Sequence, residues 1–211
     1  IYASLIAMKQ DDLKRLIAYS SIAHIGLMGL TIFASTDIGM QGVMIQAFNH
    51  GINVIGLWIV GELIERQFGT RKISELGGLA QKAPGLAILL VVVALANVAL
   101  PLTNAFVGEF LMFTGIFTSN VSQYNFIYTA VAGLSIILSA VYTLNMIQKI
   151  FFGNTNGLTA KGRDANWNEK LVLGLLVLAI VAIGIYPQPV LDLTKGAVDS
   201  ILSQMITKHP T

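Results

Sequence analysis

Residues 99–113, ALPLTNAFVGEFLMF, place a proline and a glutamate inside an apolar run that extends from Gly85 to Ser119. One helix crosses the hydrocarbon core of a bilayer with about 20 apolar residues, so this run is too long for a single straight span. Pro101 lacks a backbone N–H and its ring disrupts the preceding turn, so we expect a broken helix. Glu109 then lies in the second half of that helix.

The composition of the whole chain is typical of a helical membrane protein. Of its 211 residues, 55% are hydrophobic and 11% are charged, whereas soluble domains are usually about 25% charged. The chain has no Cys and a net charge of +2, which excludes a disulfide scaffold and argues against nucleic acid as a partner. We therefore expect an all-α polytopic membrane protein in contact with the lipid bilayer, as a piece of a longer polypeptide.

The apolar pattern predicts five membrane spans, the third of them broken at Pro101. The spans are Leu16–Ser35, Ile38–Gly61, Gly85–Ser119, Tyr124–Gln148 and Leu171–Tyr186, and residues 1–8 resemble the end of an earlier helix. The last span carries no charge and is expected to face lipid. Residues 1–187 thus form the predicted membrane domain, and 188–211 form an interfacial amphipathic helix and tail.

The distribution of basic residues predicts the orientation. Eleven of the 13 Lys and Arg residues fall in the connections on one side of the predicted spans. The positive-inside rule makes that side cytoplasmic and places the C-terminus on the other side. The expected location is the bacterial cytoplasmic membrane, with the mitochondrial inner membrane as the alternative.

Four polar residues lie on one face of the second span, spaced i, i+3, i+4 and i+7. They are Gln46, Asn49, His50 and Asn53. They must face other helices or water, because their hydrogen-bonding groups would be unsatisfied in lipid. His24 gives the first span a weaker stripe. In the fourth span, the Ser135, Ser139 and Thr143 stripe is interpreted as helix packing.

Glu109 is the one charged residue in the middle of a predicted span. Placing a charge at the bilayer centre costs about 2.5–3.5 kcal/mol, so its retention suggests a function. Its expected partner is His50, a water or a group outside this sequence, and a structural ion pair is the alternative role. Carboxyl and imidazole groups can exchange protons near neutral pH. The break at Pro101, with Asn104 beside it, can hold water at membrane depth.

Cofactor motifs are absent from the sequence. It contains no GxGxxG, no P-loop, no Cys cluster and no HExxH. We therefore expect that this chain binds no cofactor and no metal, and that any redox chemistry takes place in another subunit.

Four runs resemble the subunit M family of respiratory complex I, the proton-pumping NADH:quinone oxidoreductase, whose mitochondrial counterpart is NADH dehydrogenase subunit 4. They are DDLKRLIAYSSIAHIGLM (11–28), IQAFNHGINVIGLW (45–58), ALPLTNAFVGEFLMF (99–113) and IYPQPVLD (185–192). The resemblance implies an antiporter-like fold of inverted repeats, each with a broken helix. This chain would supply most of the second repeat and the last span.

The resemblance also implies roles for individual residues. Glu109 matches the acidic residue of the second broken helix, on the output side of the proton path. His50 and His24 match histidines of the central polar axis, and Lys14 matches a lysine at the membrane boundary. Where family members often have PGTGN, this chain has PLTNA (101–105), which should stiffen the break.

The function implied is proton translocation, coupled to quinone reduction elsewhere in a complex. NADH, flavin, iron–sulfur clusters and quinone would be bound by partner subunits, and the membrane partners would be the L-type and N-type antiporter-like subunits. The alternatives are a subunit of a multi-subunit cation/proton antiporter and a non-conducting membrane scaffold. The buried Glu109 and the His50 stripe argue against the scaffold.

Overall fold

The structure, a computed structural model, describes the backbone of residues 1–208 and the side chains of residues 1–204. This part of the chain consists of α-helices with three short 3-10 turns and no β-strand. The α-helices are α1 (Tyr2–Ala7), α2 (Leu13–Ala34), α3 (Asp37–Phe68), α4 (Pro84–Asn97), α5 (Asn104–Phe117), α6 (Asn125–Phe151), α7 (Trp167–Ile185) and α8 (Gln188–Lys208). The expected all-α fold is confirmed.

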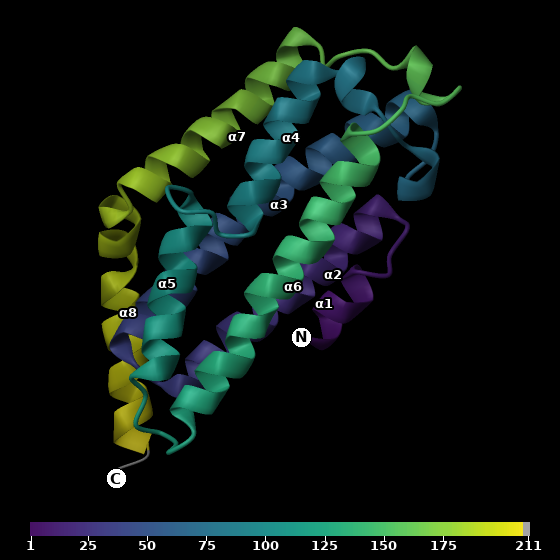
Figure 1. The fold of residues 1–211 in the computed structure, drawn as a ribbon. Coiled ribbons are helices and arrows are strands. Elements are labelled where there is room, and N and C mark those ends of the chain that lie inside the picture. The colour runs from purple at the N-terminus through teal and green to yellow at the C-terminus, as the bar shows by residue number, and fades with distance from the viewer. Residues whose placement is uncertain (209–211) are drawn as a thin grey trace.

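Four of the described helices, α2, α3, α6 and α7, are long and apolar enough to cross a membrane. The shorter apolar helices α4 and α5 follow each other from one end of the bundle to the other (Figure 1). Together these two form the broken third span, so the predicted arrangement of five spans is confirmed.

Local sequence explains where the helices begin. Asp12 accepts a hydrogen bond from the Arg15 N–H at the start of α2, and the Thr36 side chain does the same for Gly39 in α3. At the start of α7, Asn166 and Glu169 form a capping box. Each contact satisfies backbone N–H groups that a helix end leaves without a partner.

α3 continues to Phe68, seven residues beyond the predicted end of the span at Gly61. Charged residues interrupt the apolar run beyond Gly61, but Leu63 and Ile64 remain buried in the core. Glu62 and Arg66, one turn apart, add an ion pair of 2.8 Å on the outer face of the helix. The helix ends at Gly69, which has a left-handed φ of 68°. The predicted boundary was therefore the end of the apolar segment and not the end of the helix.

The break between α4 and α5 contains two non-glycine residues with left-handed backbone. Ala99 has a φ of 56° and Leu102, which directly follows Pro101, has a φ of 72°; side chains with a Cβ adopt this region reluctantly. Gly184 of α7 lies directly against the Leu102 carbonyl, where a Cβ would collide with it. Close packing of α7 therefore supports the strained turn.

α3 and α5 approach each other closely through small residues. A Cβ on Gly42 of α3 would lie 2.7 Å from the backbone N of Met112 in α5, and a Cβ on Gly108 of α5 would collide with the Gln46 side chain. Such contacts between small residues are typical of membrane helices, in which backbones pack closely. They bring the polar face of α3 next to Glu109.

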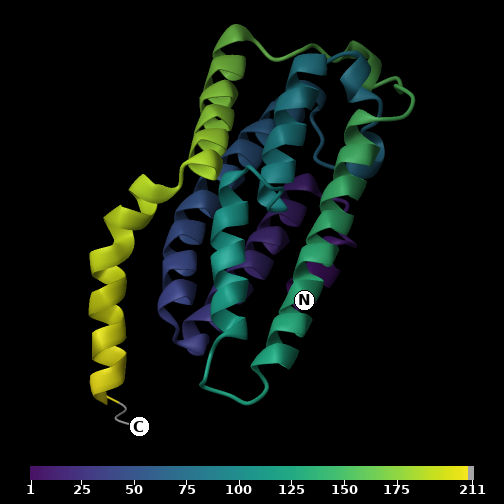
Figure 2. The same ribbon diagram turned by 60° about the vertical axis from the view of Figure 1, so that its left-hand side comes forward.

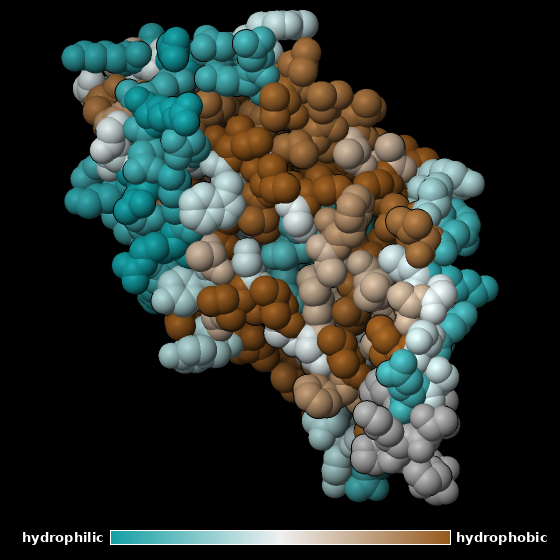
Figure 3. Space-filling model, turned by 180° about the vertical axis from the view of Figure 1, so that it is seen from behind, coloured by the Kyte–Doolittle hydropathy of each residue, from teal (hydrophilic) through white to brown (hydrophobic). Residues whose placement is uncertain are grey.

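The basic connections gather at one end of the bundle, which we call the loop end. Hydrogen bonds join the connections to one another there, from Ser74 to Asp11 and from the Gly78 N–H to the Phe152 carbonyl. In the space-filling view, hydrophilic side chains cover this end and hydrophobic ones dominate the middle of the surface (Figure 3). The basic connections thus share one end of the bundle, and the assignment of that end to the cytoplasmic side stays a prediction.

The two last helices lie on the outside of the bundle. Most of the α7 surface is exposed, as expected for a helix facing lipid, and only Leu173 and Ile180 are buried. α8 runs beside the N-terminal half of α3 (Figures 1 and 2). On the predicted apolar face of α8, Val198 is fully buried, and the side chain of Met205 lies outside the described residues. Its place at the membrane interface stays a prediction.

Candidate functional site

Three buried titratable side chains meet in the middle of the bundle. His24 of α2 lies between Glu109 of α5 and His50 of α3: its Nδ1 is 3.4 Å from Glu109 Oε1, and the two imidazole ring centroids are 4.9 Å apart. All three side chains are buried. The sequence alone suggested His50 as the protein partner of Glu109, whereas the structure places His24 in direct contact with the carboxylate.

Two asparagines fix the start of α5 against α3. Asn49 Nδ2 donates to the Asn104 carbonyl oxygen at 2.7 Å, and Asn104 Nδ2 donates back to the Asn49 carbonyl at 3.3 Å. Asn104 is the first residue of α5 after the break at Pro101. The break therefore sets the depth of Glu109, and the paired asparagines hold that depth relative to His50. Pro101 itself is exposed, and the structure shows no hydrogen bond from it to the two asparagines, Glu109 or His50 in the described part of the chain.

A further hydrogen bond fixes the end of α4 against α2. Asn97 Nδ2 donates to Ser20 Oγ at 3.2 Å, and Ser20 lies one turn before His24 on the same face. The two sides of the break, the end of α4 and the start of α5, are thus hydrogen-bonded to the helices that carry the two histidines. The broken helix positions the site through side-chain amides.

The polar stripe of α3 faces the protein interior, as its spacing predicts. Gln46, Asn49 and Asn53 are each at most 1% exposed. Several of their amide atoms, together with Nε2 of both His24 and His50, have no hydrogen-bond partner among the described residues. An unsatisfied buried polar group costs about 1–3 kcal/mol. The stripe is thus a costly polar surface in the middle of the bundle, suited to ordering water.

α6 closes the site on the side opposite α3. A cavity of about 10 Å³, roughly the volume that one water needs, is lined by His24, Glu109, Ser135, Ser139 and Tyr142 together with apolar residues. Both serine hydroxyls donate to carbonyls of α6 itself. Tyr142 was not predicted, although it lies three residues after Ser139 on the face of the serine stripe, because that stripe was interpreted as helix packing.

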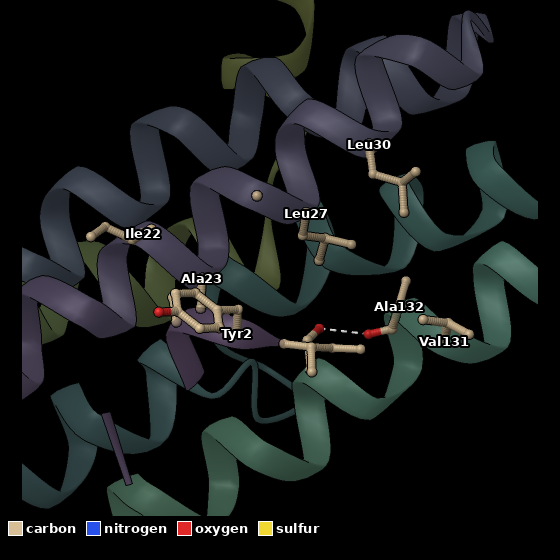
Figure 4. A pocket seen from close by; sticks show the side chains of 11 residues that line it. Tyr2, Ile22, Ala23, Leu27, Leu30, Val131 and Ala132 are labelled. Carbon is tan, nitrogen blue, oxygen red and sulfur yellow. Dashed lines mark hydrogen bonds between the residues drawn. The ribbon is translucent and has the colours of Figure 1, made fainter. Parts of the chain in front are cut away.

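A larger cavity of about 400 Å³ lies beside this site, between α1, α2 and α6. Tyr2, Ile22, Leu27, Leu30 and Val131 surround it (Figure 4). Its lining is almost entirely apolar, so it offers no polar path of its own.

Lys14 lies away from the buried cluster. It is ten residues before His24 on α2, or about 15 Å along the helix axis, and its Nζ is 2.8 Å from Glu62 Oε2 and 2.6 Å from Glu65 Oε2. Arg71 joins the same group through Glu65 Oε1 at 3.8 Å, and it also pairs with Asp12 at 3.1 Å. The structure thus places Lys14 in an ion-pair network at the loop end.

Asp164, in the connection before α7, joins the starts of two helices. Its carboxylate accepts from the N–H groups of Gly85 and Leu86 at the start of α4, and Lys170 Nζ of α7 lies 2.7 Å away. Partial burial opposes ionisation, but the Lys170 contact and the backbone donors outweigh it and lower the pKa of Asp164 below its ordinary value.

The described residues contain no group of three His, Cys, Asp or Glu side chains that could hold a metal ion. The chemistry available at the site is therefore that of its carboxyl, imidazole, amide and hydroxyl groups. Glu109 and His24 are in ion-pair contact, and His50 lies in contact with His24 on the side of the polar stripe.

Comparison with known proteins finds similar sequences and similar folds. Residues 1–127 match the sequence model of a family described as NADH:quinone oxidoreductase/Mrp antiporter, transmembrane. Over 204 residues, 96% of this chain, the sequence is 40% identical to NADH-quinone oxidoreductase subunit M of Rickettsia felis, of which the match covers 40%. The chain therefore spans about two fifths of the length of that relative.

Solved structures share the fold. A chain of respiratory complex I from Thermus thermophilus with bound NADH superimposes with a TM-score of 0.83 at 31% identity, covering 95% of this chain and 42% of that chain. A chain of the Mrp complex from a Dietzia species gives the same TM-score at 18% identity, covering 94% and 44%. The second likeness concerns the fold alone.

Proposed function

This chain belongs to the NADH:quinone oxidoreductase/Mrp antiporter transmembrane family, and on that premise we propose that it forms part of a proton-translocating membrane subunit of an NADH:quinone oxidoreductase. Protons move through Glu109, His24 and His50, and the energy comes from quinone reduction elsewhere in the complex. The membrane is the bacterial cytoplasmic membrane, and the loop end faces the cytoplasm.

The observation that carries this proposal is the contact between Glu109 and His24. A carboxyl and an imidazole 3.4 Å apart, both buried, form a pair that can hold one proton in two places. His24 has a second nitrogen, and an imidazole can take up a proton at one nitrogen and release one at the other. The proton can thus continue to His50 and the polar stripe of α3.

Partners supply what this chain lacks. NADH, flavin, iron–sulfur clusters and quinone are bound by other subunits in this proposal, and other antiporter-like membrane subunits, the L-type and N-type, pack against its exposed apolar faces. The relative from Rickettsia felis is named as an oxidoreductase subunit, which supports this assignment.

A subunit of a multi-subunit cation/proton antiporter is the second candidate, favoured by the shared fold of the Mrp complex chain. The much higher identity to the oxidoreductase subunit, 40% against 18%, favours the first. Purification of the complex separates them: flavin and iron–sulfur absorbance in the co-purified subunits supports the oxidoreductase, and their absence supports the antiporter.

Substitution of Glu109 in the intact complex tests the proton-carrier role. Glu109→Gln keeps the shape of the side chain but cannot release a proton, so we expect proton pumping and coupled quinone reduction to fall strongly while subunit content stays normal. Glu109→Asp keeps the titrating group with a shorter reach and should retain part of the activity. Pumping is measured in membrane vesicles, with subunit content determined by immunoblot.

The outcomes separate a chemical role from a structural one. Burying a charge is unfavourable, so Glu109→Ala should assemble at least as well as the native protein. Poor assembly with normal pumping per complex would make Glu109 a packing residue. Native pumping in the Gln variant would refute the proton-carrier role.

A further inference from the structure

Tyr142 of α6 lies between two small cavities. Its side chain is 1% exposed. On one side it lines the inner cavity, with His24, Glu109 and Ser139. On the other side it lines a second cavity, also of about 10 Å³, with Gln10, Asn145 and Lys149 among its walls; we call this the outer cavity. Among the described residues, Tyr142 alone lines both cavities.

The outer cavity lies toward the loop end of the bundle. Lys149 is in the last turn of α6, close to the basic connections. Asn145 lies one turn before it on α6, and both side chains reach the surface. Each of the two cavities has about the volume that one water molecule needs, and each has polar side chains in its wall. The buried ring of Tyr142 separates the surface from the Glu109–His24 pair.

The hydroxyl group of Tyr142 is in an unusual state for a buried polar group. Its oxygen makes no hydrogen bond of standard geometry to the described residues. Ser20 and Glu109 are the polar side chains near enough to interact with it. Buried Tyr hydroxyls usually find a partner, and a hydroxyl can both donate and accept. The hydroxyl is therefore available to donate and accept hydrogen bonds beside Ser20 and Glu109, and the residue that carries it borders both cavities.

We propose that the Tyr142 hydroxyl is a proton relay between the loop-end surface and the Glu109–His24 pair, with the outer cavity as its opening toward that surface. The pair then takes up protons from the loop end before they leave on the output side that the resemblance implies for Glu109. This inference rests on the proposed function. A protonated water in the outer cavity gives a proton to the phenol oxygen, so one O–H bond of that water breaks as the new phenol O–H bond forms. The original phenol O–H bond breaks in the same step, and its proton passes to a water in the inner cavity and on to the Glu109–His24 pair. The phenol stays neutral, and rotation of the hydroxyl restores the starting state.

Tyr142→Phe in the intact complex tests the relay. The substitution removes only the hydroxyl, which makes no hydrogen bond of standard geometry to the described residues. If the ring of Tyr142 only packs in the core, thermal stability and pumping should both stay unchanged. The relay predicts unchanged thermal stability and subunit content with roughly tenfold slower pumping, the lower range of what a positioned proton-transfer group contributes. Tyr128→Phe is the matched control, because Tyr128 is an exposed Tyr on the same helix.

A second variant keeps the test decisive if Tyr142→Phe lowers the content of the complex. Asn145→Leu replaces a polar wall of the outer cavity by an apolar one of similar size, and pumping should again slow while Tyr128→Phe pumps normally. Native pumping in Tyr142→Phe, or in Asn145→Leu where Tyr142→Phe does not assemble, overturns the relay. If Glu109→Gln is inactive in that same experiment, the proposed function stands without the relay. If Glu109→Gln also pumps normally, the proposed function fails with it.

Discussion

The loop-end ion pairs and the buried cluster are two polar regions that share α2 and α3, and they differ in how completely their charged and polar groups are paired. At the loop end, Lys14, Glu62, Glu65 and Arg66 neutralise one another, with contacts of 2.6 to 2.8 Å. In the middle of the bundle, Glu109 faces one imidazole at 3.4 Å, and the amides around it retain unpartnered atoms. One region satisfies its charges, whereas the other leaves them poorly satisfied.

This difference separates structure from function. Exposed ion pairs contribute little to stability and are easily replaced. A carboxyl at membrane depth is costly, and a chain retains it for what it can do. Departures from the usual rules of packing and hydrogen bonding are expected at functional sites. The comparison therefore supports the proposal that the buried cluster transfers protons, whereas the loop-end charges stabilise the ends of the helices.

Substitution of His24 should have the largest effect. His24→Gln removes the imidazole that joins Glu109 to His50, so we expect roughly tenfold slower proton pumping with normal assembly. Because the two residues act as one unit, the double variant with Glu109→Gln should be little worse than either single variant. Pumping and NADH oxidation are measured in the same vesicles. Additive losses would show that the two side chains act separately.

Gly42→Ala should disturb the frame that holds the cluster. The new Cβ would lie 2.7 Å from the Met112 backbone N, so α3 and α5 must separate; overpacking of this kind typically costs about 1–3 kcal/mol. We expect lower thermal stability of the complex and weaker pumping. Gly51→Ala, on the same helix with open space around it, is the control. Equal stability of the two variants would contradict the close packing of α3 and α5.

Asp164→Asn should change stability only in a pH-dependent way. The pKa of Asp164 in the folded protein lies below its ordinary value of 3.8. The stabilisation from its ionised form is therefore complete above that ordinary value and is lost as the pH falls through the lowered folded pKa. The native protein should lose thermal stability in this acidic range, and the Asn variant should show a smaller loss. Parallel pH profiles of melting temperature would contradict the assignment.

Lys14→Gln should have the smallest effect on pumping. Its ammonium group interacts with Glu62 and Glu65 at the loop end, far from Glu109. We expect a small decrease in melting temperature and pumping within roughly twofold of the native rate, as for an exposed ion pair. A loss of pumping as large as that of His24→Gln would place Lys14 in the proton path and remove the distinction between the two regions.

The sequence predicts the features that depend on neighbours along one helix. The break at Pro101, the burial of the stripe around His50 and the exposed last span follow from helix periodicity and bilayer length. α3 extends past Gly61 because Leu63 and Ile64 stay buried between the charged residues of this segment, and average hydropathy does not detect such an alternation.

Contacts between helices are harder to predict. The contact of His24 with Glu109 depends on the depth at which α2 and α5 pack, and this depth is set by Asn97, Asn104 and glycine contacts that no periodicity reveals. Tyr142 lies on the face of the serine stripe of α6, but the two cavities that it borders are formed by residues of α1, α2, α5, α6 and the loop-end connections. Its role is visible only after the helices are packed.

In the proposed mechanism, Glu109 and His24 share a proton that moves during turnover. Infrared difference spectroscopy of the reconstituted complex, recorded with and without NADH, measures this directly through the carboxyl and imidazole bands. We expect a carboxyl band that changes on turnover and shifts in D₂O. This band should be altered by His24→Gln and absent in Glu109→Gln. A difference spectrum that is the same in the native protein and in Glu109→Gln would contradict this mechanism.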